Sequence, residues 1–377
     1  MKKIIIYYGS KSGFERLLPP DIKTLSQFIG EDDAKRKQIV VTYKTDSVAM
    51  DKDESKDPDK NFITNLVAFS ESYAGITESA IQSFISIISG YEIENLFLQN
   101  PPIQIKQQLE QAYANIITIQ KCEYKTLSKS MFEKINNNFS ERIIGQENVK
   151  ERLLISLYPL LTKSNKNKPI VLMFYGASGV GKTETAKFIS EILGQSLFRK
   201  QFSMFHSSEF SNYLFGGNHF QSCFSRDLLE RESNVILLDE FDKPNPIFHS
   251  AFYQLFDEGI FEDKNYRVDL YNAIIICTSN YSSESEIRKY LGDPIFFRFD
   301  KFIKFENLSI NAIKKIIEKT INKKYNTLNK YDKKNVDIEY IKNVMCSYSS
   351  NLSNVRQITT IVEEFFGIQL VKNFFKN

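Results

Sequence analysis

The stretch from Lys168 to Glu191, KPIVLMFYGASGVGKTETAKFISE, constrains the fold of this chain more than any other. Its first part, Pro169 to Tyr175, is almost continuously apolar, which is typical of a parallel strand covered on both faces. A glycine-rich loop follows, and then Ala186, Ile189 and Leu193 recur at the spacing of an amphipathic helix. A strand, a glycine-rich loop and a helix in this order predict an α/β fold with a phosphate-binding loop.

The loop matches the pattern G-x-x-x-x-G-K-[ST] at Gly176, Gly181, Lys182 and Thr183. Glycines let the backbone turn tightly so that its N–H groups point at a phosphate chain, and the helix N-terminus adds positive potential. Lys182 can offer an ammonium to the β- and γ-phosphates of ATP, and the Thr183 hydroxyl can ligate the Mg²⁺ that bridges them. An ordinary glycine-rich turn would not need the flanking strand and helix. The residues that we expect to bind nucleotide here are Gly176, Ser178, Gly179, Val180, Gly181, Lys182, Thr183 and Glu184.

Two further apolar strands are expected to end beside this loop. Asn234 to Glu240 ends in the acids Asp239 and Glu240, and Ala273 to Asn280 ends in a polar amide. The carboxyl ends of parallel strands meet at one edge of a sheet, so these groups should face the phosphates. Asp239 can hold Mg²⁺ through its waters, and Glu240 can orient and deprotonate the attacking water. Asn280 could bond the γ-phosphate or the water, or could simply form a turn.

The remaining patterns predict a small α/β domain before this one and a helical domain after it. In the first part, strands are expected at Lys3–Tyr8 and Gln38–Thr45, and helices at Asp21–Ile29, Thr77–Ser89 and Ile103–Ala114. Tyr8 to Gly13 resembles a phosphate loop only weakly, and a plain turn is the alternative. Further strands are expected at Phe198–Phe202 and Lys301–Phe305, and helices start at Ser309 and near Asn354. We predict an N-terminal α/β domain at 1–125, a linker helix at 126–139, a large ATPase domain with a parallel five-stranded sheet at 140–308, and a helical lid at 309–377.

The composition indicates a globular protein and excludes several classes. A chain of 377 residues with 42% hydrophobic and 25% charged residues is long enough for two or three domains. A formal charge of +3 is too small to suggest nucleic acid. The spacing of Cys122, Cys223, Cys277 and Cys346 fits neither a zinc site nor a disulfide framework, so we expect reduced thiols in a cytoplasmic protein. The start, MKKIIIYYG, is too short for a signal sequence, and no window has the length of a membrane span.

From about Phe139 to Phe366 the chain resembles AAA+ ATPases of the Clp/heat-shock branch, which are disaggregase and unfoldase chaperones. The resemblance implies one ATPase module that binds ATP and Mg²⁺ and assembles into a homo-oligomeric ring or spiral, with a hexamer expected. It also implies that Ile144 and Gly145 lie against the adenine. The motifs behind it are IIGQE at Ile143–Glu147, GASGVGKTETAK at Gly176–Lys187, VILLDEFDK at Val235–Lys243, FYQLFDEG at Phe252–Gly259, IIICTSN at Ile274–Asn280 and PIFFRFDKFIKFENL at Pro294–Leu308.

The same resemblance implies three catalytic roles besides that of Glu240. Asn280 is similar to the sensor-1 residue of the family, and Arg356, in SNVRQ, to its sensor-2 arginine. Arg298, in FFRFD, is similar to the arginine finger that reaches a neighbouring subunit's ATP. A finger places a delocalised cation on developing negative charge, so hydrolysis depends on assembly. From the residues alone, Arg298 could instead pair with Asp300, and Arg356 could be an exposed helix arginine.

The chain departs from the family at its expected substrate loop. Clp unfoldases grip polypeptide with an aromatic pore loop, usually G-Y-V-G, whereas residues 214–221 here read LFGGNHFQ. Phe220 could be the gripping aromatic, or it could be a core residue. We find no peptidase docking loop, because only thirteen residues separate Asn280 from Pro294. A proteolytic partner of the usual kind is therefore not expected.

These patterns predict an ATP- and Mg²⁺-dependent ATPase that remodels or unfolds protein. Its N-terminal domain would select the protein substrate or adaptor. An alternative is an ATP-gated switch or scaffold that acts with a partner protein, as in a stress or antiphage module, without threading a substrate. A nucleic-acid remodeller is less favoured, because no basic and aromatic cluster is evident.

Overall fold

The protein is described from a computed structural model, which covers residues 1–31, 62–162, 164–165, 167–204, 207–218 and 220–375. The expected strand at Gln38–Thr45 lies outside the described residues. The chain divides into two compact units, each of which is described by itself. The first unit contains residues 1–124, 206–232 and 260–269, and the second contains residues 125–205, 233–259 and 270–377.

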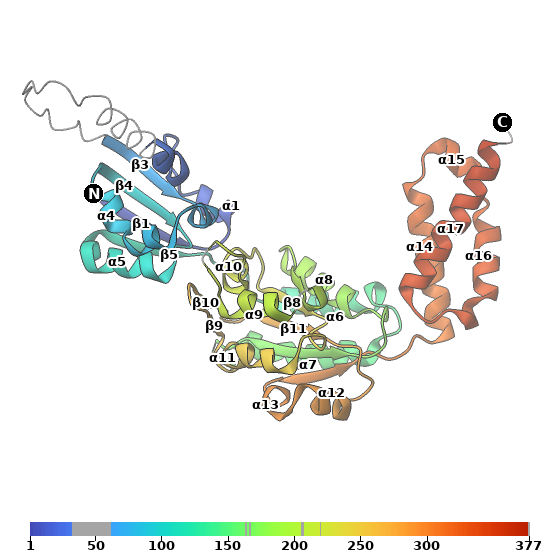
Figure 1. Cartoon of the computed structure of the whole chain (residues 1–377). Helices are drawn as coiled ribbons and strands as arrows, with labels where there is room; N and C mark the ends of the chain where they lie inside the picture. The colour runs from blue at the N-terminus through green and yellow to red at the C-terminus, as the bar shows by residue number, and fades with distance from the viewer. Residues whose placement is uncertain (32–61, 163, 166, 205–206, 219, 376–377) are drawn as a thin grey trace, which may run out of the picture. The chain divides into compact units, whose positions relative to one another are not determined.

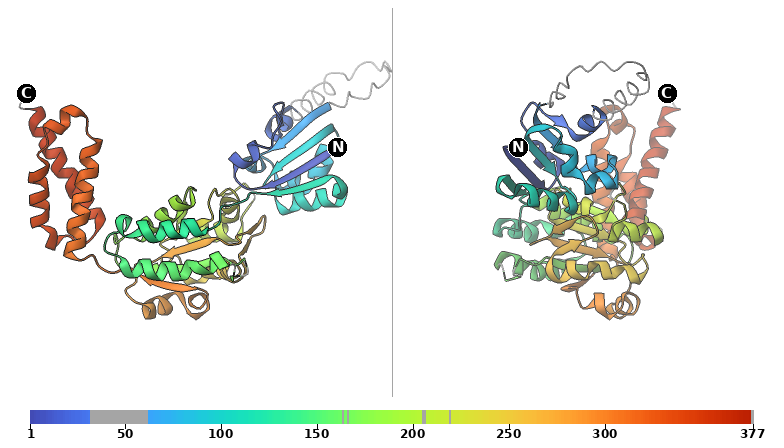
Figure 2. Two further views of the ribbon diagram at one scale, coloured as in Figure 1. Left: turned by 180° about the vertical axis from the view of Figure 1, so that it is seen from behind. Right: turned by 60° about the vertical axis from the view of Figure 1, so that its left-hand side comes forward.

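The first unit is built on a parallel five-stranded sheet with the order β2-β3-β4-β1-β5 (Figures 1 and 2). Apolar side chains cover both faces of the sheet, so its central strands are buried. The strands are β1 (Lys3–Tyr8), β2 (Lys23–Thr24), β3 (Phe62–Ala68), β4 (Glu92–Gln99) and β5 (Ile117–Lys121), and the helices include α1 (Lys11–Glu15), α3 (Glu78–Gln82), α4 (Phe84–Ile88) and α5 (Ile103–Tyr113). The predicted strand at Lys3–Tyr8 and the helix starting at Ile103 are confirmed.

Two predicted helices of this unit differ from the structure. The helix expected at Thr77–Ser89 breaks into α3 and α4 at Ser83, whose hydroxyl donates to the Ser79 carbonyl at 2.7 Å. A serine that bonds back to the preceding turn competes with the helical hydrogen bonds. The helix expected from Asp21 begins only after β2, which pairs with β3. Strand pairing, which depends on a distant segment, therefore overrides the local helical pattern.

The loop that weakly resembled a phosphate loop joins β1 to α1 and is bonded to Asn100 at the end of β4. The Gly9 N–H donates to the Asn100 side chain at 2.9 Å, and the Asn100 amide donates back to the Gly9 carbonyl at 3.0 Å. A Cβ at Gly13 would overlap the Tyr7 hydroxyl. A Cβ at Gly9 would lie 2.5 Å from that of Cys122, so packing requires both glycines.

Four short elements from the middle of the chain complete the first unit. They are α9 (Ser207–Phe215), α10 (Phe224–Leu229), β9 (Ile260–Glu262) and β10 (Arg267–Asp269), and β9 pairs antiparallel with β10. The Ile103 N–H, at the start of α5, donates to the Asn265 carbonyl at 2.9 Å. The Asn265 amide donates to the Gly217 carbonyl at 3.1 Å, and the Arg231 guanidinium lies 4.0 Å from the ring centroid of Tyr124. These contacts join the loop after α9 to the N-terminal sheet.

The second unit contains the predicted parallel five-stranded sheet, with the order β12-β6-β11-β8-β7. Every residue of β6, β8 and β11 is buried, which explains their continuous apolar sequences. The predicted α/β fold class is confirmed. The strands are β6 (Ile170–Tyr175), β7 (Phe198–Gln201), β8 (Val235–Asp239), β11 (Ile274–Thr278) and β12 (Lys301–Lys304), and the helices are α6 (Lys129–Arg142), α7 (Glu147–Thr162), α8 (Lys182–Leu193), α11 (Tyr253–Glu258), α12 (Glu284–Leu291) and α13 (Asp293–Phe296).

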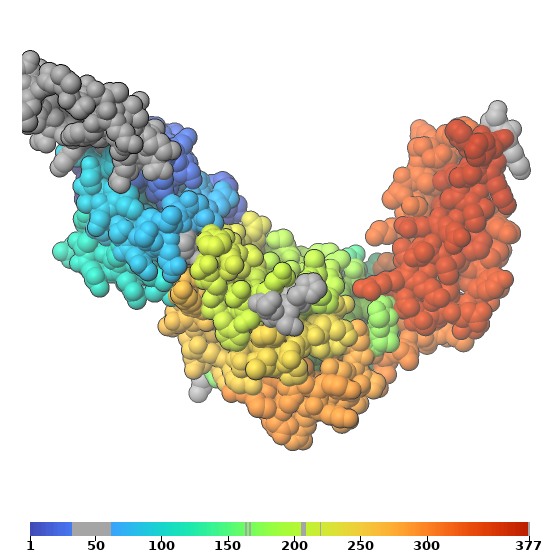
Figure 3. Space-filling model, in the orientation of Figure 1, coloured from blue at the N-terminus to red at the C-terminus, as the bar shows by residue number. Residues whose placement is uncertain are grey.

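The C-terminal part of the second unit is a helical bundle (Figure 1) with its own apolar core. Its outer surface is drawn in orange and red in Figure 3. Its helices are α14 (Ile310–Thr327), α15 (Lys330–Lys334), α16 (Ile338–Ser347) and α17 (Val355–Phe374). The Ser309 hydroxyl caps α14 and the Asn354 side chain caps α17, as their positions predicted. Ile313, Ile317 and Ile321 are buried as expected, whereas Ile310 is exposed because it lies at the first position of its helix. No described helix is both long enough and apolar enough to span a bilayer.

Two glycines allow a matched test of backbone conformation. Gly176 has a φ of +130°, and a Cβ there would overlap the carbonyl oxygen of Phe305. Gly367 lies inside α17, and a Cβ added there would have no neighbouring atom within 4 Å. We expect Gly176→Ala to lower the melting temperature, because alanine at a positive φ costs more than about 1 kcal/mol. Gly367→Ala should raise it, because alanine favours a helix interior by roughly 0.5–1 kcal/mol. Calorimetry of both variants tests this, and a Gly176→Ala protein as stable as the wild type would contradict the described loop.

Candidate ATP site

The phosphate loop joins β6 to α8 in the conformation that its glycines predicted. Gly176, Gly179 and Gly181 have φ values of +130°, +75° and +114°, which residues with a Cβ rarely adopt. The Gly179 carbonyl accepts a hydrogen bond from the Val355 N–H at 3.0 Å, and a Cβ at Gly179 would lie 2.8 Å from that of Asn354. The first turn of α17 therefore packs directly on the loop.

Lys182 lies at the centre of the site and is bonded to neutral oxygens. Its ammonium donates to the carbonyls of Gly176 at 2.6 Å and Ala177 at 2.8 Å, and to the Asn280 side chain at 3.2 Å. Burial lowers the pKa of Lys182 to about 8, and the nearby Arg356 acts in the same direction, whereas Asp239 opposes it. A buried cation held by neutral oxygens favours a ligand that brings negative charge.

Asp239 ends β8 and has a hydrogen-bond partner on each carboxylate oxygen. Oδ1 accepts from the Thr278 hydroxyl at 2.5 Å, and Oδ2 accepts from the Arg199 guanidinium through Nε at 3.0 Å and Nη2 at 2.5 Å. Thr278 is the last residue of β11, and Arg199 lies on β7. The strands on both sides of β8 therefore orient its terminal carboxylate.

Glu240 follows Asp239 in an unusual backbone conformation. Its φ of +57° is uncommon for a residue with a side chain and is found more often at functional sites. The conformation is supported by its N–H, which donates to the Thr278 hydroxyl at 2.9 Å. The Glu240 carboxylate accepts from the Gln201 amide at 3.2 Å. The next residue, Phe241, packs among Phe252, Phe256 and Phe299, so a buried aromatic cluster anchors the strand end.

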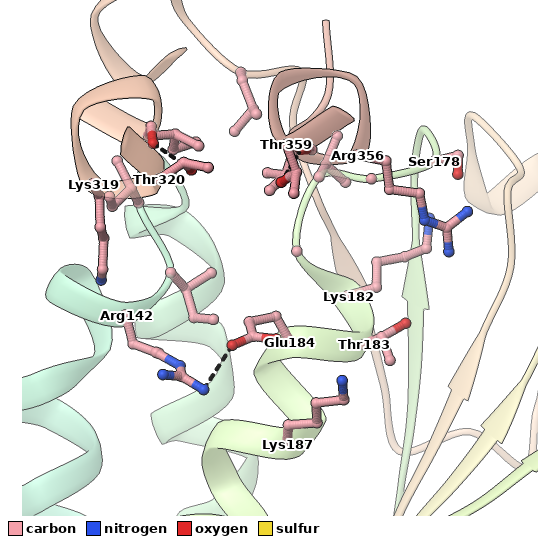
Figure 4. A pocket seen from close by; sticks show the side chains of 18 of the residues that line it. Arg142, Ser178, Lys182, Thr183, Glu184, Lys187, Lys319, Thr320, Arg356 and Thr359 are labelled. Carbon is pink, nitrogen blue, oxygen red and sulfur yellow. Dashed lines mark hydrogen bonds and ion pairs between the residues drawn. The ribbon is translucent and has the colours of Figure 1, made fainter. Parts of the chain in front are cut away.

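A pocket of about 820 Å³ brings these groups together (Figure 4). Eight lysine and arginine side chains and four carboxylates line it, so the excess charge is positive, as a polyphosphate requires. The apolar part includes the predicted Ile144, together with Ile143, Leu308, Ile316 and Val362. The basic residues are Arg142, Lys182, Lys187, Arg199, Lys319, Lys323, Lys324 and Arg356.

Most of the predicted nucleotide-binding residues line this pocket. They are Ile144, Ser178, Gly179, Val180, Gly181, Lys182, Thr183, Glu184, Asp239, Glu240, Asn280 and Arg356. Figure 4 shows Lys182 and Arg356 extending into the same part of the pocket, and shows Glu184 paired with Arg142 at 2.8 Å. Gly145 lies outside the lining, where its φ of +82° and the adjacent Ala312 explain the glycine. Gly176 also lies outside it, at the end of β6.

Known proteins are similar to the part of the chain that contains the phosphate loop and the strands beside this pocket. Residues 167–330 match the family described as AAA domain (Cdc48 subfamily). This part of the chain is therefore similar to an AAA domain. It is 32% identical to the AAA+ ATPase ClpV1 of Pseudomonas aeruginosa over 42% of this chain and 19% of that protein. It is 27% identical to the chaperone protein ClpB of Malacoplasma penetrans over 74% of this chain and 44% of that protein.

A solved structure is similar in fold to this chain. It is the closed-state cryo-EM reconstruction of Hsp104 with ATPγS and FITC casein, with a TM-score of 0.56 and 13% identity, and the match covers 100% of this chain and 89% of that one. At this identity the likeness concerns the fold alone. The chain spans less than half the length of the two curated relatives named above.

Arg298 lies outside the lining of the pocket in its own AAA domain. Its Nε donates to Asp257 at 2.8 Å, and its guanidinium lies 4.2 Å from the ring centroid of Tyr253. Asp300, the alternative partner considered from the sequence, instead accepts from the Val171 N–H at 2.7 Å. The Arg298 guanidinium is therefore held by two residues of α11, and its role as an arginine finger stays a prediction.

Phe220 is 55% exposed, so of the two alternatives left open by the sequence it is not a core residue, and its role in gripping polypeptide stays a prediction. The nearby Tyr213 and Leu214 of α9 are buried in the core instead.

Sequence reasoning missed three residues that bond the two acids. Arg199 and Gln201 alternate on β7, so their side chains lie on one side of the strand. Thr278, the last residue of β11, lies two residues before the predicted Asn280. The alternation of Arg199 and Gln201 along an expected strand was the one sequence pattern that could have indicated polar side chains beside the two acids. It was weak because β7 is a short edge strand.

Lys182→Ala should weaken ATP binding by roughly tenfold to a hundredfold, because each charge-assisted hydrogen bond is worth about 1.5–3 kcal/mol. Titration with a fluorescent ATP analogue measures the effect. Lys314→Ala, on the exposed side of α14, is the matched control and should bind as the wild type does. If the Lys182→Ala protein kept its melting temperature and bound ATP with wild-type affinity, the phosphates would not lie at this loop.

Proposed function

We propose that this protein is an ATP- and Mg²⁺-dependent ATPase that remodels or unfolds other proteins. The observation that supports this best is the convergence of Lys182, Glu240 and Asn280 at one edge of a parallel sheet. Two of its relatives are named as chaperone or Clp ATPase proteins, which adds support for the substrate class. The protein substrate and the assembly are parts of the proposal, since the chain matches only part of each relative.

The residues present suit ATP with Mg²⁺. Thr183 and Asp239 offer a hydroxyl and a carboxylate, the hard oxygen ligands that Mg²⁺ prefers beside phosphate oxygens. When bound, the ion would neutralise negative charge that develops on the phosphates. Lys182 would exchange its carbonyl partners for phosphate oxygens, and Glu240 would hold a water molecule and accept its proton. Asn280, already bonded to Lys182, would orient the same water or the γ-phosphate.

We infer that subunits assemble into a ring, most simply a hexamer, in which Arg298 completes the site of a neighbour. Arg298 is only 28% exposed at its side chain and pairs with Asp257, so its position is defined before any contact with a second subunit. The basic residues of its own pocket come from other elements. A finger in trans would explain why a family-like arginine is ordered away from the nucleotide of its own chain.

Mixing two inactive variants tests this arrangement. Arg298→Ala subunits keep Glu240, and Glu240→Gln subunits keep the arginine, so a mixed ring should regain ATPase activity at seams where the two meet. The matched control replaces the second partner with the double variant Glu240→Gln/Arg298→Ala, which should restore nothing. Absence of recovery at every mixing ratio, with both proteins shown to be in one particle, would refute a finger in trans.

We propose that the N-terminal fold selects the substrate or adaptor and that Phe220 grips the polypeptide. The hydrogen bonds from Ile103 to Asn265 and from Asn265 to Gly217 support a mechanical link between that fold and the loop before Phe220. The loop lacks the usual tetrapeptide, so one exposed aromatic would have to supply the grip.

Phe220→Ala should abolish ATP-driven unfolding of a fluorescent model protein while leaving basal ATP hydrolysis close to that of the wild type. Phe374→Ala, an exposed phenylalanine at the end of α17, controls for general loss of apolar surface. Unfolding should be measured by loss of fluorescence beside ATP turnover in the same sample. Undiminished unfolding by the Phe220→Ala protein would argue against threading and would favour a nucleotide-gated switch.

A further inference from the structure

Arg199 forms an ion pair with Asp239, the carboxylate proposed to hold Mg²⁺, and both side chains line the pocket. Its Nε and Nη2 both donate to Oδ2 of Asp239. The Asp239 side chain is 9% exposed, whereas that of Arg199 is 39% exposed. The carboxylate is therefore fixed, and the cation is the partner that can move into the pocket.

The other oxygen of Asp239 is also engaged, because it accepts the Thr278 hydroxyl. Thr278 in turn accepts from the Glu240 N–H, so this hydroxyl is held by the strand ends themselves. Oδ2 is the oxygen that can be freed without disturbing β8 and β11. A guanidinium that donates twice to Oδ2 occupies the directions from which a metal ion or its waters would approach.

We propose that Arg199 competes with Mg²⁺ for Asp239 and thereby adjusts how strongly ATP binding depends on the metal. This inference rests on the proposed function, in which Asp239 faces the Mg²⁺ of bound nucleotide. With the guanidinium on Asp239, the negative charge beside the phosphates is neutralised, so metal-free ATP is tolerated. With Mg²⁺ on Asp239, the guanidinium is displaced into the pocket, where the phosphate chain can accept its hydrogen bonds.

Competition between Arg199 and Mg²⁺ for Asp239 determines whether loss of Arg199 strengthens or weakens the binding of ATP and of Mg²⁺. Removal of Arg199 exposes the carboxylate, which then repels metal-free ATP and attracts Mg²⁺ without a rival. Binding of the metal and of the guanidinium are linked through one oxygen, so each weakens the other by the same factor. Arg199 is thus a positioning residue, since it acts through Asp239.

The experiment titrates a fluorescent ATP analogue into the full chain, with EDTA and over a range of Mg²⁺ concentrations. For Arg199→Ala we expect up to about fivefold weaker binding in EDTA, as for a partly exposed charge pair. We also expect half-maximal metal stimulation at a Mg²⁺ concentration lower by a similar factor. Arg199→Lys keeps the positive charge but loses the paired donors, so its ATP affinity in EDTA should lie between those of the wild type and the Arg199→Ala protein. Lys200→Ala, the next residue of β7 and absent from the pocket lining, should match the wild type.

The outcomes separate this proposal from the function on which it rests. The proposal would be overturned if ATP binding by the Arg199→Ala protein depended on Mg²⁺ as it does in the wild type, while binding by the Asp239→Ala protein did not depend on Mg²⁺. In that case Asp239 would still hold the metal, but Arg199 would not compete with it. Wild-type Mg²⁺ dependence in Asp239→Ala would overturn the metal role of Asp239 and with it this inference. A melting temperature lowered by Arg199→Ala without any change in Mg²⁺ dependence would assign the pair a structural role only.

Discussion

The parallel register of three buried strands determines where the chemistry of this protein can occur. Cys277 of β11 is level with Met173 on one side and with Leu238 on the other. The next residues along the chain, Thr278 and Asp239, therefore emerge together at the carboxyl edge, where their side chains bond. The phosphate loop begins one residue after β6 at the same edge. Each strand is apolar up to this edge, so the polar groups meet where the buried sheet ends.

A single hydroxyl connects the two acids to their neighbouring strand. Thr278 donates to Asp239 and accepts from the Glu240 N–H, so one side chain fixes the Asp239 carboxylate and the unusual backbone of the next residue. The positive φ of Glu240 is thereby compensated by a hydrogen bond and by the burial of Phe241. The strain is local, and the surrounding packing makes it tolerable without a glycine.

Much of this arrangement follows from sequence because its signals are local and periodic. The apolar runs predicted β6, β8 and β11, and the residues that follow them, Lys182, Asp239 and Asn280, were predicted to meet. The contact of Arg199 with Asp239 was not predicted, because the sequence of a short, half-buried edge strand does not indicate which carboxylate its side chains will contact. Residues 206–232 follow ATPase motifs in the chain yet pack with the N-terminal sheet, and no periodicity encodes such distant contacts. The division into domains thus stays a prediction, whereas strand patterns alone determined the fold class.

Two arginines in this structure share one physical situation, in which a cation expected near phosphate is paired with a carboxylate of its own chain. Arg199 is held by Asp239 and Arg298 by Asp257. Such partly exposed pairs are worth about 1 kcal/mol or less, which the attraction to the several negative charges of ATP can exceed. Each ion pair therefore orders its arginine side chain but is weak enough to be broken. In the proposed assembly, bound nucleotide replaces the carboxylate partner of each arginine with little loss of free energy. Arg199 acts within the subunit and Arg298 across a subunit seam.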